Sequence, residues 1–327
     1  MDVLAVALGD PAGIGPEIIA LAWAQRREAG LPPFFAIGDK RSLRAVWDGP
    51  ITIVSGPDEA VRAFDEGLPL IQVDDPGEIV PGEPNLAGAR CALDSLEIAV
   101  GLTRAGSARA VVTGPVSKAQ LYAIGFTHPG QTEFIAERCG MAAGNTVMML
   151  AGPSLRTVPI TIHTPLSEVS SQLTTELIVS RARVAARGLQ RDFGIAAPRL
   201  AVAGLNPHAG GGGTPGREGI DIITPAIEAL RAEDIDAFGP LAADTMFHAA
   251  ARERYDAAIC MYHDQALIPL KTLHFDAGVN VTLGLPIVRT SPDHGTAFDI
   301  AGKRLARADA IIAAIRMAGE CAVRREA

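Results

Sequence analysis

Three of the seven histidines follow short apolar runs that have the composition of buried strands. They are His163 after 158–162, His208 after 200–205 and His263 after 257–261. If these runs are parallel neighbours in one sheet, their carboxyl ends share an edge and the three imidazoles can converge. Neutral imidazole suits zinc, cobalt, nickel or iron, and three protein ligands with one open position form a catalytic metal site. Because a single histidine is more often an ordinary loop or core residue, the residues alone leave both interpretations open.

Two glycine-containing segments, 9–17 and 113–118, predict turns from a strand into a helix. A third, 130–133, predicts another helix start. A helix N-terminus binds anions through its free backbone N–H groups, and Lys118 and Thr132 add a cation and a hydroxyl at two of these turns. The first segment lacks the G-x-G-x-x-G spacing of a Rossmann dinucleotide site, so a tight structural turn is an equally good interpretation.

A group of polar residues surrounds the apolar run 279–283, which is expected to be a strand. Lys271 precedes the run, Asn280 lies within it and Arg289 follows it. One such cation would be ordinary on a protein surface, whereas the three together are typical of a clamp for a phosphate or a carboxylate. The sequence alone leaves the surface role and the clamp both open.

The rest of the chain alternates short apolar runs with longer segments of helical period. The expected strands are 3–8, 34–37, 51–54, 70–72, 110–113, 147–151, 158–162, 200–205, 257–261 and 279–283. The expected helices include 16–27, 86–105, 173–189 and 221–231. This alternation predicts an α/β fold with a largely parallel sheet flanked by helices. Many of the 34 glycines follow the strands, which indicates that ligands bind at that edge.

The composition excludes several classes of protein. The 327 residues are 48% hydrophobic and 20% charged, which is incompatible with general disorder. A net charge of −8 without a basic run argues against nucleic-acid binding, and no apolar run is long enough for a membrane span. Cys91, Cys139, Cys260 and Cys321 have no paired spacing and are expected to be free thiols. Since the first residues do not look like a signal peptide, the expected location is the cytoplasm.

Taken together, these segments resemble the 4-hydroxythreonine-4-phosphate dehydrogenase (PdxA) family almost from end to end. The resemblance is carried by GDPAGIGPEI (9–18), TGPVSK (113–118), GLNPHAG (204–210), GPLAADT (239–245), YHDQ (262–265) and VNVTLGLPIVRTSPDHGTAFDIAGK (279–303). The last segment is also similar to a stretch of the isocitrate and isopropylmalate dehydrogenases. The resemblance implies two α/β domains with a cleft between them. It also implies NAD or NADP as a cofactor and one divalent metal (zinc, magnesium or cobalt) per active site.

The resemblance further implies the reaction and the partners. The family oxidises 4-phosphohydroxy-L-threonine to 2-amino-3-oxo-4-(phosphooxy)butanoate, which decarboxylates to 3-amino-2-oxopropyl phosphate in pyridoxine 5′-phosphate (vitamin B6) biosynthesis. The implied partners are this phosphorylated amino acid and a second copy of the chain, in a homodimer whose active sites are shared. No nucleic acid or membrane partner is expected.

The family's functional positions fall on particular residues of this sequence. The implied metal ligands are His163, His208 and His263. The implied substrate contacts are Gln131, Thr132, Lys271, Asn280 and Arg289, and the expected cofactor side contains Asp293, His294, Gly295 and Asp299. The proton acceptor is left open between Lys118, Asp244 and Asp264, because either aspartate can instead support a metal-bound histidine. Residues 1–125 with 285–327 are expected to form the NAD-side domain, and 126–284 the domain with the metal and substrate ligands and the dimer interface.

Two positions depart from the family pattern. Gln131 stands where a histidine is usual, and a glutamine can donate a hydrogen bond but cannot carry a positive charge. Gly211 stands where glutamate is frequent. Gln131 leaves open a related dehydrogenase acting on 4-phosphothreonate or 4-phosphoerythronate. Three histidines with lysine and arginine would also serve a metal-dependent phosphate-ester hydrolase, an isomerase or a non-catalytic phosphosugar-binding protein.

Overall fold

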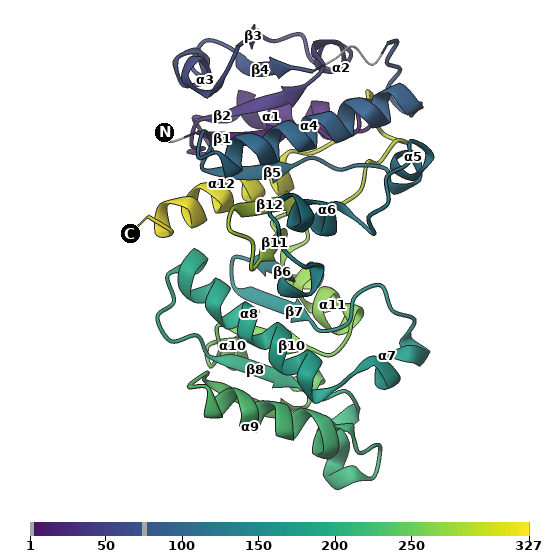
Figure 1. The fold of residues 1–327 in the computed structure, drawn as a ribbon, viewed down its shortest axis with the longest axis vertical. Helices are drawn as coiled ribbons and strands as arrows, with labels where there is room; N and C mark the ends of the chain where they lie inside the picture. Colours follow the sequence, from purple (N-terminus) through teal and green to yellow (C-terminus); the bar gives the residue numbers. More distant parts are fainter. Residues whose placement is uncertain (1–2, 74–76, 327) are drawn as a thin grey trace. The chain divides into compact units, whose positions relative to one another are not determined.

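The computed structural model describes residues 3–73 and 77–326, and the chain divides into two compact units (Figure 1). The first unit contains Met1–Ala143 and Leu285–Ala327, and the second contains Gly144–Gly284. Each unit has its own mostly parallel strands with helices packed on them. The α/β fold class predicted from the sequence is therefore confirmed. Across the described residues, every helix is too short or too polar to span a lipid bilayer.

The strands of the first unit are paired in parallel in the order β3-β4-β2-β1-β5-β12. They are β1 (Leu4–Ala7), β2 (Phe34–Gly38), β3 (Ile51–Ile53), β4 (Leu68–Gln72), β5 (Ala110–Thr113) and β12 (Val288–Pro292). The helices are α1 (Gly15–Ala24), α2 (Lys40–Arg44), α3 (Pro57–Ala63), α4 (Leu86–Arg104), α5 (Lys118–Ala123), α6 (Gln131–Arg138) and α12 (Asp309–Arg324). The strand order reverses between β1 and β5, and ligands of α/β sheets bind at such a switch point.

The second unit has the strand order β11-β6-β7-β10-β8-β9, in which β11-β6 and β6-β7 are antiparallel and the other pairs parallel. The strands are β6 (Val147–Gly152), β7 (Leu155–Pro159), β8 (Leu200–Ala203), β9 (Ala237–Leu241), β10 (Ala257–Cys260) and β11 (Val279–Leu283). The helices are α7 (Leu166–Gln172), α8 (Thr175–Phe193), α9 (Thr224–Ala232), α10 (Ala249–Arg252) and α11 (His263–His274). Short 3-10 turns (Ala143–Asn145, Pro207–Gly213 and Ala243–Thr245) and a π-turn (Gly219–Ile223) complete the described elements.

Local sequence explains where the long helices begin and end. The side chain of Asn85 accepts a hydrogen bond from Gly88 N at the start of α4, and that of Thr174 accepts one from Leu177 N at the start of α8. Such caps satisfy N–H groups that have no partner inside the helix. α8 ends at Gly194, whose φ of 68° is left-handed and therefore favours glycine.

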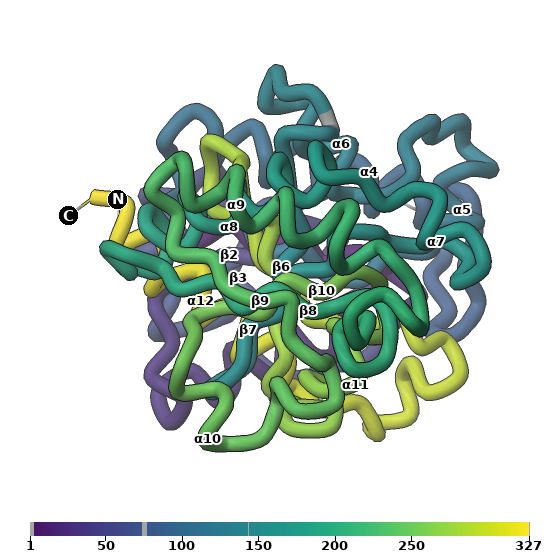
Figure 2. The backbone as a smooth tube through the Cα atoms, turned by 90° about the horizontal axis from the view of Figure 1, so that it is seen from below, coloured from purple at the N-terminus to yellow at the C-terminus, as the bar shows by residue number. Residues whose placement is uncertain are grey.

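Two helices that are far apart in the sequence cover the first sheet. α4 packs along β1, β2 and β5 (Figure 1), and α12 packs on β12 and β5. Figure 2 shows the yellow α12 beside the purple N-terminal segments, in agreement with its contacts to α1 and β1. The C-terminal helix is thus part of the first unit.

The apolar core of the first unit includes α6 and the segment before it. Phe126, Phe134 and Ile135 are buried in one cluster with Phe35 of β2 and Leu96 of α4. Burying a side chain of this size contributes about 1.5–3 kcal/mol, so these residues hold 126–143 to the first unit. The units divide at 143/144 and 284/285, whereas the sequence placed the first boundary at 125/126.

Candidate active site

The three histidines lie after three neighbouring parallel strands. β10 pairs with β7 on one side and with β8 on the other. His163 follows β7, His208 follows β8, and His263 follows β10 as the first residue of α11. The strands therefore direct the three histidines to the carboxyl edge of the second sheet.

His163 and His263 form a pair at this edge. Their ring centroids lie 6.0 Å apart with 37° between the ring planes. His263 Nδ1 lies 2.7 Å from Asp264 Oδ1, and since a carboxylate only accepts, Nδ1 carries the proton and Nε2 is free to act as a ligand. A carboxylate that fixes the tautomer in this way is the usual support of a metal-binding histidine.

His208 lies in the turn Pro207–Gly213, which has left-handed backbone angles. His208 and Ala209 both have φ of 54°, and His163 has the same value. Such angles are uncommon for residues other than glycine, cost about 1–3 kcal/mol and gather at functional sites. Within residues 3–73 and 77–326, however, no three His, Cys, Asp or Glu side chains are arranged to hold a metal ion. The structure thus pairs two of the expected ligands and does not complete the set of three.

The candidate proton acceptors lie in different environments. Asp264 contacts His263, whereas Asp244 is exposed in the short turn Ala243–Thr245 that follows β9. Lys118 is the exposed first residue of α5 in the first unit. The contact with His263 fits a supporting role for Asp264, and all three residues remain candidates for the proton acceptor.

A buried guanidinium lies at the carboxyl edge of the first sheet. Arg289 is on β12, which pairs in parallel with β5, and its side chain donates to Thr113 Oγ1 at 2.8 Å. The residue is only 4% exposed, and this burial lowers its pKa to about 10, opposed by the negative charge of Glu133. The guanidinium is still charged at neutral pH, so it can receive a phosphate or a carboxylate.

The start of α6 adds polar groups to the first unit. Gln131 Nε2 donates to Gly114 O at 3.3 Å, and its buried Oε1 has no hydrogen-bond partner. A Cβ added at Gly130 would lie 3.2 Å from Glu133 Oε2 and 3.7 Å from Lys118 Nζ. The helix start predicted from the sequence is therefore present, with a cation and an unsatisfied amide beside it. Glu133 was not singled out from the sequence, although it is the third residue of this helix.

Lys271 and Asn280 belong to the second unit, in contrast to Arg289. Lys271 lies on α11, and Asn280 lies on β11 opposite Leu150 of β6. The buried Oδ1 of Asn280 has no hydrogen-bond partner. An amide oxygen left unpaired in a protein interior costs about 1–3 kcal/mol, so its presence indicates a site that a ligand or water completes.

The segment with the expected cofactor residues follows β12. His294 Nδ1 lies 3.0 Å from Gly295 O, and Asp299 is exposed. Thr296 O accepts a hydrogen bond from Ile14 N at 3.0 Å. The segment therefore lies against the turn that follows β1, beside the switch point of the first sheet.

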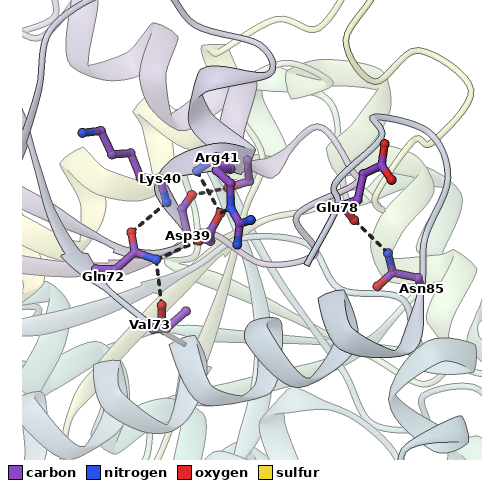
Figure 3. Close-up of polar contacts among 8 residues, drawn as sticks. Asp39, Lys40, Arg41, Gln72, Val73, Glu78 and Asn85 are labelled. Atoms are coloured by element: carbon purple, nitrogen blue, oxygen red, sulfur yellow. Dashed lines mark hydrogen bonds and ion pairs between the residues drawn. The ribbon is translucent and has the colours of Figure 1, made fainter. Parts of the chain in front are cut away.

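A second acidic residue at this edge has a structural role. Asp39 follows β2, where Rossmann folds place the acid that binds a ribose. Here Asp39 is 3% exposed and accepts from Arg41 N at 2.8 Å and from Gln72 Nε2 at 2.7 Å (Figure 3). Gln72 Oε1 in turn accepts from Lys40 N. Asp39 therefore caps α2 and orients Gln72.

Comparison with known proteins assigns the family. The sequence matches the family described as pyridoxal phosphate biosynthetic protein PdxA over residues 31–318. It is 58% identical to a 4-hydroxythreonine-4-phosphate dehydrogenase of Zymomonas mobilis, over 100% of this chain and 98% of that protein, and 57% identical to the Erythrobacter litoralis protein of the same name, over 98% and 97%. The crystal structure of a 4-hydroxythreonine-4-phosphate dehydrogenase from Klebsiella pneumoniae superposes with a TM-score of 0.87 at 36% identity, over 98% of both chains. The chain therefore belongs to the PdxA family of pyridoxal phosphate biosynthetic proteins.

Proposed function

We propose that the chain catalyses the NAD(P)-linked oxidation of 4-phosphohydroxy-L-threonine in pyridoxal phosphate biosynthesis. The observation that supports this most strongly is the full-length identity of 58% to a protein named for that activity. When bound, NAD(P)⁺ would supply the hydride acceptor for the carbinol carbon, and a base of the protein would take the hydroxyl proton. The product, 2-amino-3-oxo-4-(phosphooxy)butanoate, is a β-keto acid. Its new carbonyl accepts the electron pair when CO₂ leaves, which gives 3-amino-2-oxopropyl phosphate.

We assign one divalent ion (zinc, magnesium or cobalt) to His163, His208 and His263. The supporting observations are the common sheet edge, the pairing of two imidazoles and the Asp264 carboxylate that fixes the tautomer of His263. When bound, such an ion lowers the pKa of the substrate hydroxyl. His208 is assigned as the third ligand on the turn Pro207–Gly213, where the glycines that follow it give the backbone conformational freedom.

Substrate binding is assigned to Gln131, Thr132, Lys271, Asn280 and Arg289. Arg289 and Lys271 carry positive charge for the phosphate and carboxylate, and Thr132 adds a hydroxyl at the start of α6. The buried oxygens of Gln131 and Asn280 have no partner within the protein, which fits an additional contact to substrate or bound water. Binding energy from the phosphate end would hold the reacting carbon in place for hydride transfer.

The cofactor-binding and proton-transfer roles are assigned by resemblance to the family. Asp293, His294, Gly295 and Asp299 are assigned to the side of NAD or NADP, and Lys118, Asp244 or Asp264 to the proton. A homodimer with shared active sites and a cytoplasmic location complete the proposal.

The test is a spectrophotometric assay of NADH formation with a divalent metal and a panel of substrates. We expect the highest kcat/KM for 4-phosphohydroxy-L-threonine, and higher values for 4-phosphothreonate or 4-phosphoerythronate would contradict the substrate assignment. Gln131→His in the same assay asks whether the family histidine changes the preference. Release of inorganic phosphate without NADH would instead indicate a hydrolase.

A further inference from the structure

The turn after β1 and the segment after β12 are in direct contact, although they lie near opposite ends of the sequence. Ile14 N donates to Thr296 O at 3.0 Å. A Cβ added at Gly13 would lie 3.0 Å from that oxygen and 3.1 Å from Thr296 Cβ. The backbone of the turn is therefore in contact with Thr296, and a side chain at position 13 would force Thr296 to shift by a few tenths of an ångström.

Glu17 makes a second contact with the same segment. Its Oε2 accepts from Gly302 N at 3.3 Å, and a backbone hydrogen bond from Ala306 also favours its charged form. The residue is 4% exposed, and burial raises its pKa in spite of these two bonds. A buried carboxylate is costly unless it is hydrogen-bonded, so Glu17 and the two amides depend on one another.

The turn has the internal bonds that a rigid support needs. Asp10 Oδ1 accepts from Ala12 N at 3.1 Å, and Asp10 O accepts from Gly13 N at 3.0 Å. Ala12 O in turn accepts from Gly82 N at 2.7 Å, and a Cβ at Gly82 would lie 2.9 Å from Phe298 O. The segment after β12 therefore lies against the backbone at two places, the turn 9–17 and Gly82.

A cavity of about 110 Å³ adjoins the Glu17 contact. It is lined by Glu17, Arg44, Trp47, Gly302 and Arg304 among others. Space of this size admits water, so removing the carboxylate would expose the amides behind it to solvent. The exchange rate of the Gly302 amide hydrogen therefore measures directly whether its bond to Glu17 is present.

We propose that Glu17 is a positioning residue that holds segment 293–306 in the shape that receives the dinucleotide, with Gly13 as the second point of support. This inference rests on the proposed assignment of NAD(P) to Asp293–Asp299. Glu17 acts through the amides of Gly302 and Ala306 and does not itself contact the cofactor. The turn 9–17 is thereby a support for the cofactor segment.

The first test is hydrogen exchange of the full-length protein without ligands. In Glu17→Ala we expect the amides of Gly302 and Ala306 to exchange about tenfold faster, as expected for the loss of hydrogen bonds to a charged group. Glu17→Gln keeps one acceptor oxygen and should restore much of the protection. Glu28→Ala, an exposed position beyond the end of α1, is the control. Equal exchange in wild type and Glu17→Ala would overturn the proposal.

The second test is calorimetric measurement of NAD⁺ affinity. We expect the Kd for NAD⁺ to rise about tenfold in Glu17→Ala and in Gly13→Ala, where the added methyl displaces Thr296, with substrate affinity unchanged. Gly13→Ala keeps the inference testable if Glu17→Ala does not fold. Equal NAD⁺ affinity in wild type and both variants contradicts the positioning role. Wild-type protein that binds NAD⁺ but forms no NADH with any substrate contradicts only the proposed reaction.

Discussion

The two units present the carboxyl edges of their sheets in different ways. In the first unit, Thr296 O accepts from Ile14 N and the Glu17 carboxylate accepts from Gly302 N, so that segment 293–306 is bound to the turn 9–17. The guanidinium of Arg289 is buried against Thr113. In the second unit, His163 and His208 are exposed at left-handed backbone positions, and a run of glycines follows His208.

The difference indicates two ways of building a binding edge. The first edge is held by contacts within the protein, and such contacts reduce the ordering cost of binding a large cofactor. The second edge pairs His163 with His263, and His208, the third proposed ligand, lies on a glycine-rich turn. Metal binding is commonly coupled to local folding, so titration of the metal tests this edge.

The largest expected effect comes from the second edge. His263→Ala removes one ring of the pair, so we expect loss of bound metal and at least ~100-fold lower turnover, on the order of 3 kcal/mol. Metal content and NADH formation measure this directly. His248→Ala, an exposed histidine of the same unit, should be neutral. Full activity of His263→Ala would show that the histidine edge is structural.

The next effect tests the preformed edge. Arg289→Lys keeps the charge but loses the planar fork, so we expect kcat/KM for the phosphorylated substrate to fall roughly tenfold to a hundredfold. The Kd for NAD⁺ should not change, because segment 293–306 keeps its own contacts. The exposed Arg62→Lys is the matched control. An equal fall in NAD⁺ affinity would mean that the first edge is a single cooperative site.

A smaller effect, on metal affinity, is expected at Asp264, the residue that follows His263. Asp264→Asn weakens the hydrogen bond to His263 Nδ1, and loss of such support lowers metal affinity by about tenfold. Metal titration in competition with a chelator gives the value, and Asp234→Asn is a control on the same unit. If metal affinity holds while turnover falls by several orders of magnitude, Asp264 is the proton acceptor instead.

The smallest expected effect is a pH dependence of stability, and it comes from His274, which lies at neither of the two sheet edges. Burial and the positive charge of Arg252 lower the pKa of His274, whose Nε2 lies 2.8 Å from Ser154 Oγ. The unfolded chain therefore binds a proton more readily than the folded one, and stability falls as the pH drops through 6.5 and below. Thermal unfolding of wild type and His274→Gln at pH 7.5 and 5.5 measures how much of the loss of stability at low pH comes from His274. If the variant lost as much stability as wild type, His274 would not be the cause.

The sequence predicted some strands with their limits, such as β5 and β11, and missed β9 and β12. β5 (Ala110–Thr113) has the expected limits, because its residues are small or β-branched and fully buried. β12 was not expected, since Arg289, Thr290 and Ser291 interrupt the apolar pattern, yet all three are buried in the structure. Polar side chains whose partners come from distant segments cannot be recognised as buried from local periodicity.

The same reason limits the prediction of the site. The placement of three histidines after neighbouring strands follows from local pattern and sheet topology. The bond between Gly302 and Glu17 joins residues 285 positions apart, and no local signal indicates it. The family resemblance identified motifs at both ends of the chain, but only the fold shows that they touch.

The most direct test of the central claim is a crystal structure of the protein with zinc and 4-phosphohydroxy-L-threonine. We predict nitrogen atoms of His163, His208 and His263 at about 2.0–2.1 Å from one ion, with the substrate hydroxyl at the open position. An ion held without His208, or zinc bound elsewhere while these three residues stay apart, would contradict the account.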